Sequence, residues 1–141
     1  MSKFLVPVDG SKESCIAAAW AAKTASVTGG SITLLHVYDL HAAEAMALSH
    51  LTKEEVKQLL DEKAAPVFAK AVAAITVDNP AVDKVSVIGN PADEILEYAK
   101  AKGFDHIVMG RRGLSPLGEF FMGSVTEKVM KRASCPVTVL H

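Results

Sequence analysis

The sequence predicts one α/β domain, doubly wound, in which helices cover both faces of a five-stranded parallel sheet. Short β-rich runs alternate with longer helical patterns along all 141 residues. Strands that are joined by crossover helices lie parallel, and a parallel sheet is buried on both faces. Neither a repeat nor a linker nor a low-complexity segment divides the sequence, so we expect a single domain over residues 1–141.

The first elements follow from apolar runs and glycine stops. FLVPV at 4–8 is typical of a buried strand. An alanine-rich helix is expected over 12–28, because its larger apolar side chains recur at helical spacing and Gly29-Gly30 ends it. SITLLHVYDL at 31–40 predicts the second strand. The segment 41–51 has no clear period, and we interpret it as a mobile flap or partner-facing patch, with an ordinary connection containing a short helix as the alternative.

A long helix is predicted from Thr52, because Thr52 and Glu55 have the spacing of a capping box. An apolar stripe at helical spacing continues to Ile75, and Asn79-Pro80 breaks the pattern. A stripe of this kind is typical of a helix that lies on a sheet.

The second half of the chain repeats the alternation. A strand is expected at 83–89, and Asn90 caps the next helix with Pro91 at its first position. The remaining expected elements are a strand at 105–110, a helix at 124–133 and a strand at 135–140.

The longest connection is the glycine-containing loop GRRGLSPLGEFFMGS at 110–124. Gly110 follows a strand directly, and Gly113 tolerates a positive φ and a close backbone approach. Gly123-Ser124 stands at the start of the last helix, whose free N–H groups and dipole favour an anion. Ser124 also has capping-box spacing to Glu127, so we expect it to cap that helix. The position at a strand end favours phosphate binding, and a flexible surface loop is the alternative.

Asp9 stands at the carboxyl end of the first strand, and we expect it at the same edge of the sheet as the glycine loop. Its carboxylate suits ribose hydroxyls or a metal ion. Taken alone, it is better explained as the first residue of an Asp-Gly turn. Pro7 is unexpected inside a strand and predicts a local irregularity that shapes a pocket wall.

Composition and charge exclude several classes of protein. A net charge of -1 gives no broad electrostatic case for nucleic acid or anionic membrane. No apolar run reaches the roughly 18 residues that span a bilayer. The start, MSKFLVPVDGS, is too quickly polar for a secretory signal. Cys15 and Cys135 have no metal-binding spacing and are interpreted as reduced thiols. We therefore expect a cytoplasmic protein that does not insert into membranes.

Three segments together resemble the universal stress protein family (UspA-like) in its ATP-binding branch. They are VPVDGS, the strand ending LLHVYDL, and Gly110-x-x-Gly113-x9-Gly123-Ser124. The resemblance covers essentially the whole chain, including the ending SCPVTVL. It implies a Rossmann-like fold, of the adenine nucleotide alpha hydrolase-like type, with strand order 3-2-1-4-5. It also implies an adenine nucleotide as ligand: ATP, with AMP or ADP as alternatives, and Mg²⁺ beside a triphosphate.

The resemblance also carries ligand roles over to positions of this sequence. Asp9 would bind the ribose and adenine side, Pro7 would line the same pocket, and the backbone of Val37 would meet the adenine edge. The remaining expected ligands, from ribose along the phosphate chain to the helix start, are Met109, Gly110, Arg111, Arg112, Gly113, Ser115, Gly123, Ser124 and Val125. For the two arginines, solvated loop charges are the alternative.

The last strand predicts how the protein assembles. An apolar strand at an uncovered sheet edge is a hazard unless another strand pairs with it. The resemblance implies a homodimer that pairs the segment 136–140 of two subunits about a two-fold axis.

The sequence contains no catalytic constellation. It lacks a lysine-bearing P-loop, a GxSxG elbow, an HExxH motif and a Cys/His pair at catalytic spacing. We therefore predict no catalytic residue, and a protein that holds a nucleotide rather than turning it over. The leading hypothesis is a dimeric, nucleotide-dependent stress-response or regulatory protein that acts through a protein partner. The alternatives are a slow ATPase or autophosphorylating enzyme that uses the same pocket, and a nucleotide-free dimeric scaffold.

Overall fold

The computed structural model describes residues 2–78, 81–112 and 122–141. Strands and helices alternate along these residues, with one additional short helix after the second strand. In chain order the elements are β1 (Lys3–Pro7), α1 (Lys12–Thr28), β2 (Ser31–Tyr38), α2 (Ala42–Leu48), α3 (Lys53–Ala73), β3 (Ala81–Ile88), α4 (Pro91–Ala101), β4 (His106–Gly110), α5 (Ser124–Arg132) and β5 (Val137–Leu140).

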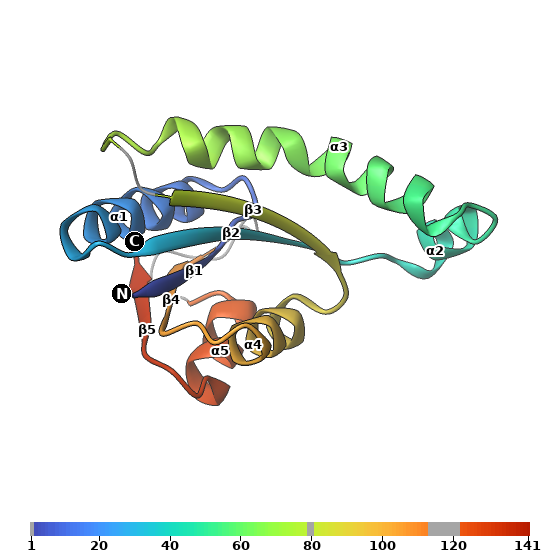
Figure 1. The fold of residues 1–141 in the computed structure, drawn as a ribbon. Coiled ribbons are helices and arrows are strands. Elements are labelled where there is room, and N and C mark those ends of the chain that lie inside the picture. The colour runs from blue at the N-terminus through green and yellow to red at the C-terminus, as the bar shows by residue number, and fades with distance from the viewer. Residues whose placement is uncertain (1, 79–80, 113–121) are drawn as a thin grey trace.

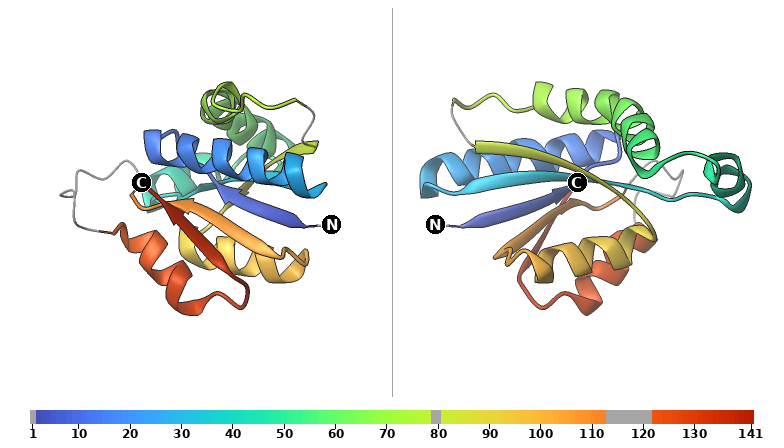
Figure 2. Two further views of the ribbon diagram at one scale, coloured as in Figure 1. Left: turned by 90° about the vertical axis from the view of Figure 1, so that its left-hand side faces the viewer. Right: turned by 45° about the vertical axis from the view of Figure 1, so that its right-hand side comes forward.

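The five strands form one sheet in the order β3-β2-β1-β4-β5, and every neighbouring pair is parallel. The predicted doubly wound fold and its strand order are therefore confirmed. Helices α1 and α3 cover one face of the sheet, and α4 and α5 cover the other (Figures 1 and 2). The chain leaves β1 toward β2 on one side and returns to β4 on the other. Ligands of such sheets bind at this reversal, beyond the carboxyl ends of the strands.

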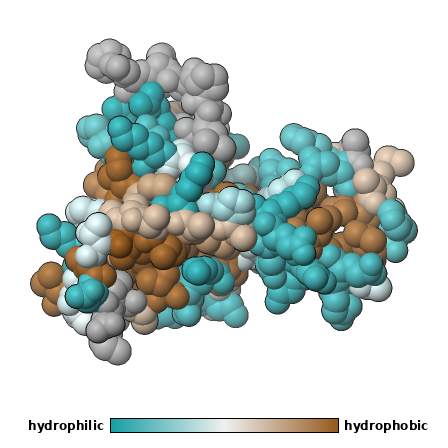
Figure 3. Space-filling view, turned by 90° about the horizontal axis from the view of Figure 1, so that it is seen from above, coloured by the Kyte–Doolittle hydropathy of each residue, from teal (hydrophilic) through white to brown (hydrophobic). Residues whose placement is uncertain are grey.

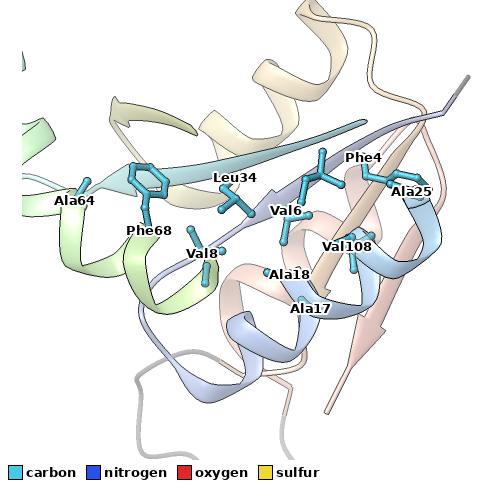
Figure 4. Packing of buried hydrophobic residues seen from close by; sticks show 14 residues of the cluster. Phe4, Val6, Val8, Ala17, Ala18, Ala25, Leu34, Ala64, Phe68 and Val108 are labelled. Carbon is cyan, nitrogen blue, oxygen red and sulfur yellow. The ribbon is translucent and has the colours of Figure 1, made fainter. Parts of the chain in front are cut away.

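Helix α1 packs on the sheet through small side chains. Five of its alanines are at most 1% exposed, and they face strand residues such as Val6 and Val108 (Figure 4). Ile16, Trp20 and Val27 are 36%, 37% and 82% exposed. The larger apolar side chains therefore lie on the outer face of α1. The inner face consists of alanines, whose small side chains let the helix approach the strands closely.

Helix α3 begins as predicted. The Thr52 hydroxyl accepts from the Glu55 N–H at 3.1 Å, and the Glu55 carboxylate accepts from the Thr52 N–H at 3.1 Å. The helix ends at Ala73, before the predicted break at 79–80, which lies outside the described residues. Its buried positions lie three or four residues apart: Leu60, Ala64, Phe68 and Ala71.

The segment 41–51 contains the short helix α2, as the alternative interpretation expected. Together with the start of α3, it projects beyond the end of the sheet (Figures 1 and 3). The Tyr38 hydroxyl donates to the Glu44 carboxylate at 2.9 Å and accepts from the Lys63 ammonium at 3.2 Å. These bonds tie α2 and α3 to the end of β2. Met46 of α2 is 77% exposed.

The second half of the fold agrees with its local signals. The Asn90 side chain accepts from the Asp93 N–H at 3.2 Å, and Pro91 is the first residue of α4. Cys15 and Cys135 are free thiols, and burial raises the pKa of Cys135. None of the helices in the described residues has the length and apolar character needed to cross a bilayer.

His106, the first residue of β4, connects this strand to β5. Its Nε2 lies 2.6 Å from the Thr138 hydroxyl, and its ring lies 5.5 Å from that of Phe4. Burial lowers the pKa of the imidazole below its ordinary value near 6.5. The folded protein therefore favours neutral His106.

We predict that His106 makes the folded protein less stable in mild acid. The unfolded imidazole takes up a proton as the pH falls through about 6.5, whereas the folded one resists it, so protonation favours the unfolded chain. The contribution of His106 is complete above this pH and is lost below it. Urea unfolding at one protein concentration, at pH 7.5 and pH 5.5, should therefore show a smaller loss of stability for His106→Gln than for the parent.

Glu127→Gln is the control for this prediction. A hydrogen bond from Lys131 lowers the pKa of Glu127 below 4.5, so its contribution changes only at lower pH. An undiminished pH dependence in His106→Gln would contradict the role of this residue.

Candidate functional site

A pocket of about 280 Å³ opens at the carboxyl ends of β1, β2 and β4. Its volume is near the lower end of the range for small-molecule sites, about 300 to 1,000 Å³. The first turns of α4 and α5 complete its wall. The lining residues are Pro7, Val8, Asp9, Ser14, Leu35, Val37, Pro91, Ile95, Met109, Gly110, Arg112, Gly123, Ser124, Val125 and Thr126.

The lining combines apolar surface with a few polar groups. Side chains such as Leu35, Val37 and Ile95 provide surface on which a planar ring can pack. Asp9 and Arg112 are the two charged residues of the lining over the part of the chain that the structure describes. This combination suits a small molecule with one flat apolar part and one polar or charged part.

The turn between β1 and α1 brings Asp9 to the pocket. The Asp9 carboxylate accepts from the Ser11 N–H at 2.9 Å, and Gly10 has a φ of 86°, which favours glycine. The Ser11 hydroxyl caps α1 by accepting from the Ser14 N–H at 3.1 Å. Asp9 therefore serves the turn and also faces the pocket, so the two interpretations of this residue are compatible. Its role as a ligand stays a prediction.

Pro7 is the last residue of β1 rather than an interior one. It keeps the parallel register opposite Leu35, and the Val8 N–H donates to the Leu35 carbonyl at 2.8 Å. The expected irregularity at Pro7 is therefore not seen, because proline is tolerated at a strand end. Pro7 does line the pocket, as predicted.

Gly110 stands where α1 meets the end of β4. A Cβ atom at this position would lie 2.7 Å from the Glu13 Cβ and 2.8 Å from its carbonyl carbon. The Gly110 carbonyl accepts from the Thr126 hydroxyl at 2.9 Å, and Thr126 is 4% exposed. The packing of α1 therefore explains the glycine, and Thr126 ties the first turn of α5 to the end of β4.

The two sides of the glycine loop meet at its base. The Gly123 N–H donates to the Arg111 carbonyl at 2.8 Å, and the Arg111 N–H donates to the Leu140 carbonyl at 2.6 Å. Arg112 lines the pocket, with its guanidinium 3.3 Å from the Glu13 carboxylate, whereas Arg111 is not part of the lining. The predicted ligands Gly113 and Ser115 lie outside the described residues.

The prediction that Ser124 caps α5 is wrong. Gly123 is the N-cap, with φ −62° and ψ 148°, and Ser124 is the first helical residue. The hydrogen bond from the Gly123 N–H to the Arg111 carbonyl holds Gly123 as the N-cap, so the helix begins one residue earlier than the capping-box spacing predicts. No side chain of the described residues caps this helix. Its first N–H groups have no acceptor within the helix, and they carry the positive end of its dipole to the pocket.

Sequence reasoning missed six residues of the lining: Val8, Ser14, Leu35, Pro91, Ile95 and Thr126. Leu35 could have been predicted, because residues two apart in a strand share a face and Val37 was already a predicted ligand. Pro91 and Ile95 belong to a helix whose place beside the pocket depends on the order of strands in the sheet.

A metal site made by side chains alone is not seen within the described ranges, where no group of three His, Cys, Asp or Glu side chains comes together.

Comparison with known proteins identifies the family. The family model described as the universal stress protein family matches residues 1–141. The chain belongs to the universal stress protein family. It is 35% identical over 137 residues to a universal stress protein of Thermus aquaticus, with 97% of this chain and 96% of the relative covered.

Solved structures share the fold of this universal stress protein. The structure of protein MJ0577 of Methanocaldococcus jannaschii matches with a TM-score of 0.80 at 31% identity, covering 99% of this chain and 94% of the other. A universal stress protein of Archaeoglobus fulgidus in complex with dAMP matches with a TM-score of 0.71 at 20% identity, covering 100% and 98%. At that identity the second likeness shows the fold alone.

We predict that Gly110→Ala destabilises this universal stress protein. The added Cβ meets the backbone of Glu13, so α1 must move away from β4 at a cost of about 1–3 kcal/mol. Urea unfolding measures the difference. The control is Ala73→Val, which enlarges an exposed side chain at the end of α3 and should change the stability by less than about 1 kcal/mol. Equal stabilities of Gly110→Ala and the parent would contradict the packing role.

Proposed function

We propose that this universal stress protein binds an adenine nucleotide in the pocket at the strand ends. One observation carries the proposal: the first turn of α5, which no side chain of the described residues caps, faces the same pocket as Asp9 and Val37. A helix start of this kind attracts phosphate, and the neighbouring apolar surface suits a base. Gly123 has a φ that any residue adopts, so its backbone conformation does not require a glycine, and we propose that a close ligand does.

The lining suggests how the nucleotide lies. The base packs between the β2 side chains and the start of α4, with the Val37 backbone at its edge. Asp9 takes the ribose hydroxyls with its second carboxylate oxygen, because the first accepts from Ser11. Met109 and Gly110 lie under the ribose and phosphates. Of the described residues, those proposed for the phosphates are Arg111, Arg112, Gly123, Ser124 and Val125.

ATP is the proposed ligand, with Mg²⁺ coordinated chiefly by phosphate oxygens and water, as magnesium prefers. AMP and ADP share the same base and ribose contacts. A protein of the same fold, from A. fulgidus, has been solved in complex with dAMP, and the lining of the pocket supports the same class of ligand here. Asp9 is the one carboxylate that the described residues contribute to the lining. That arrangement favours holding the nucleotide over turning it over.

We predict that the purified protein binds Mg-ATP and that Gly123→Val weakens binding at least tenfold. The backbone angles of Gly123 are open to valine, and the added side chain would stand beside the first turn of α5, where the phosphates are proposed to bind. Isothermal titration calorimetry gives both affinities, and mass spectrometry of the gently denatured protein detects nucleotide that co-purifies.

Ala73→Val is the control, because it adds a similar side chain at an exposed position outside the pocket. The proposal fails if the parent binds no adenine nucleotide, or if Gly123→Val binds as well as the parent.

We also propose that the protein is a homodimer through β5. The sheet ends in β3 on one side and β5 on the other. The β3 edge carries exposed Asp83 and Lys84, which discourage strand pairing, whereas β5 is the uncharged sequence VTVL. Antiparallel pairing of two β5 strands about a two-fold axis would satisfy the open edge.

Val139→Lys should shift this dimer to monomer, because two lysines then meet near the two-fold axis and a charged edge strand resists pairing. Light scattering coupled to size-exclusion chromatography measures the mass. Val27→Lys makes the same chemical change at a position that is 82% exposed, and it should leave the dimer intact. A parent that runs as a monomer, or a Val139→Lys variant that stays dimeric, would contradict the assembly.

We propose that the protein is a cytoplasmic regulatory protein, and that a protein partner distinguishes its nucleotide-bound form from its nucleotide-free form. The projection formed by α2 and the start of α3 offers a surface outside the pocket for such a partner. Affinity capture with the parent and with Gly123→Val, each with Mg-ATP, compares the partners retained. Identical sets of partners would argue against nucleotide-dependent recognition.

A further inference from the structure

An acidic side chain lies next to a lining residue on the proposed phosphate side of the pocket. Glu13, in the first turn of α1, pairs with Arg112 across 99 positions of sequence. The distance from the Arg112 Nη2 to the Glu13 Oε1 is 3.3 Å, and the two side chains are 27% and 20% exposed. Arg112 lines the pocket and Glu13 does not, so a ligand that contacts this guanidinium meets a group that already pairs with a carboxylate.

The fold fixes Glu13 in place. Its backbone lies against Gly110, close enough that a Cβ at that glycine would overlap it. Glu13 is the second residue of α1, and acidic side chains are common in the first turn of a helix. The backbone of Glu13 therefore cannot retreat from the pocket without moving α1 off β4, and the carboxylate stays near Arg112.

The negative charge of Glu13 opposes a highly charged ligand at this side of the pocket. In the part of the chain that the structure describes, Arg112 is the charged lining residue that is proposed for the phosphates, and it pairs with Glu13. A phosphate that approaches Arg112 shares it with Glu13. The repulsion between Glu13 and the ligand increases with each added phosphate charge, because both are held in a part-buried site where screening by water is reduced.

We infer that Glu13 is a specificity-determining residue: it lowers the affinity of the pocket for nucleotides in proportion to their phosphate charge. This inference rests on the proposed function. It makes the preference for ATP over AMP depend on Mg²⁺, which neutralises part of the triphosphate charge. The same carboxylate has little effect on a ligand that carries no phosphate.

Calorimetric titration with adenosine, AMP, ADP and ATP tests the inference, without and with Mg²⁺ at one ionic strength. The variant is Glu13→Gln, which keeps the shape of the side chain and a hydrogen-bond acceptor for Arg112. Without Mg²⁺ it should bind ATP on the order of tenfold more tightly than the parent, AMP a few-fold more tightly and adenosine equally. With Mg²⁺ the gain for ATP should shrink.

Three further variants make the result specific. Glu62→Gln removes the same charge from an exposed position of α3 outside the pocket, and it should leave every affinity unchanged. Arg112→Gln in the Glu13→Gln background should lose most of the gain for ATP, because Arg112 is the proposed phosphate contact that pairs with Glu13. Glu13→Ser, a residue that also suits the first turn of a helix, should reproduce the gain if Glu13→Gln is poorly folded.

The outcomes separate this inference from the proposed function. A parent that binds neither adenosine nor any nucleotide overturns the proposed function and, with it, the role of Glu13. A parent that binds while Glu13→Gln leaves the ratio of ATP to adenosine affinity unchanged overturns the inference alone. A Glu13→Gln variant that loses affinity for all phosphorylated ligands alike would show instead that Glu13 positions Arg112, and would also overturn it.

Discussion

The close approach of α1 to the sheet is the constraint on which the rest of the structure depends. Alanines on the inner face of α1 let the helix lie directly on β1 and β4, and Gly110 leaves room for its first turn. Because the helix lies this close, the turn that precedes it brings Asp9 to the pocket that the end of β4 also lines. The pocket and its acidic neighbour Glu13 therefore arise from backbone packing before any ligand is considered.

A second set of contacts fixes the opposite wall of the pocket. The Thr126 hydroxyl reaches back to the Gly110 carbonyl, and the Gly123 N–H donates to Arg111. Both bonds join the start of α5 to the end of β4, so this helix start is positioned by β4 itself. A helix N-terminus that is held in this way keeps its N–H groups oriented without reorganising when an anion arrives, which is the condition for strong electrostatic binding.

Local signals predicted the fold well because each acts within one turn or one strand. Thr52 and Asn90 cap their helices as their sequences indicate, and the alternation of elements was sufficient to predict the parallel sheet. Features that depend on tertiary contacts could not be predicted from local sequence. Ser124 has capping-box spacing, yet a bond between Gly123 and Arg111 moves the cap. The periodicity of residues 12–28 predicted a helix but did not tell which of its faces is buried, because alanines and larger apolar side chains recur with the same period. Ile95 reaches the pocket only through the strand order.

The glycines of this site are explained by different physical reasons, although the sequence suggests a single role for them. Gly10 is required by its positive φ, and Gly110 by the backbone of α1. Neither requires a ligand, so a glycine-rich sequence alone overstates the case for phosphate binding. Gly123 differs, because its backbone angles are open to every residue and it lies at a helix start in the pocket wall. A bound anion is therefore favoured by the N–H groups at the start of α5 rather than by the number of glycines in the loop.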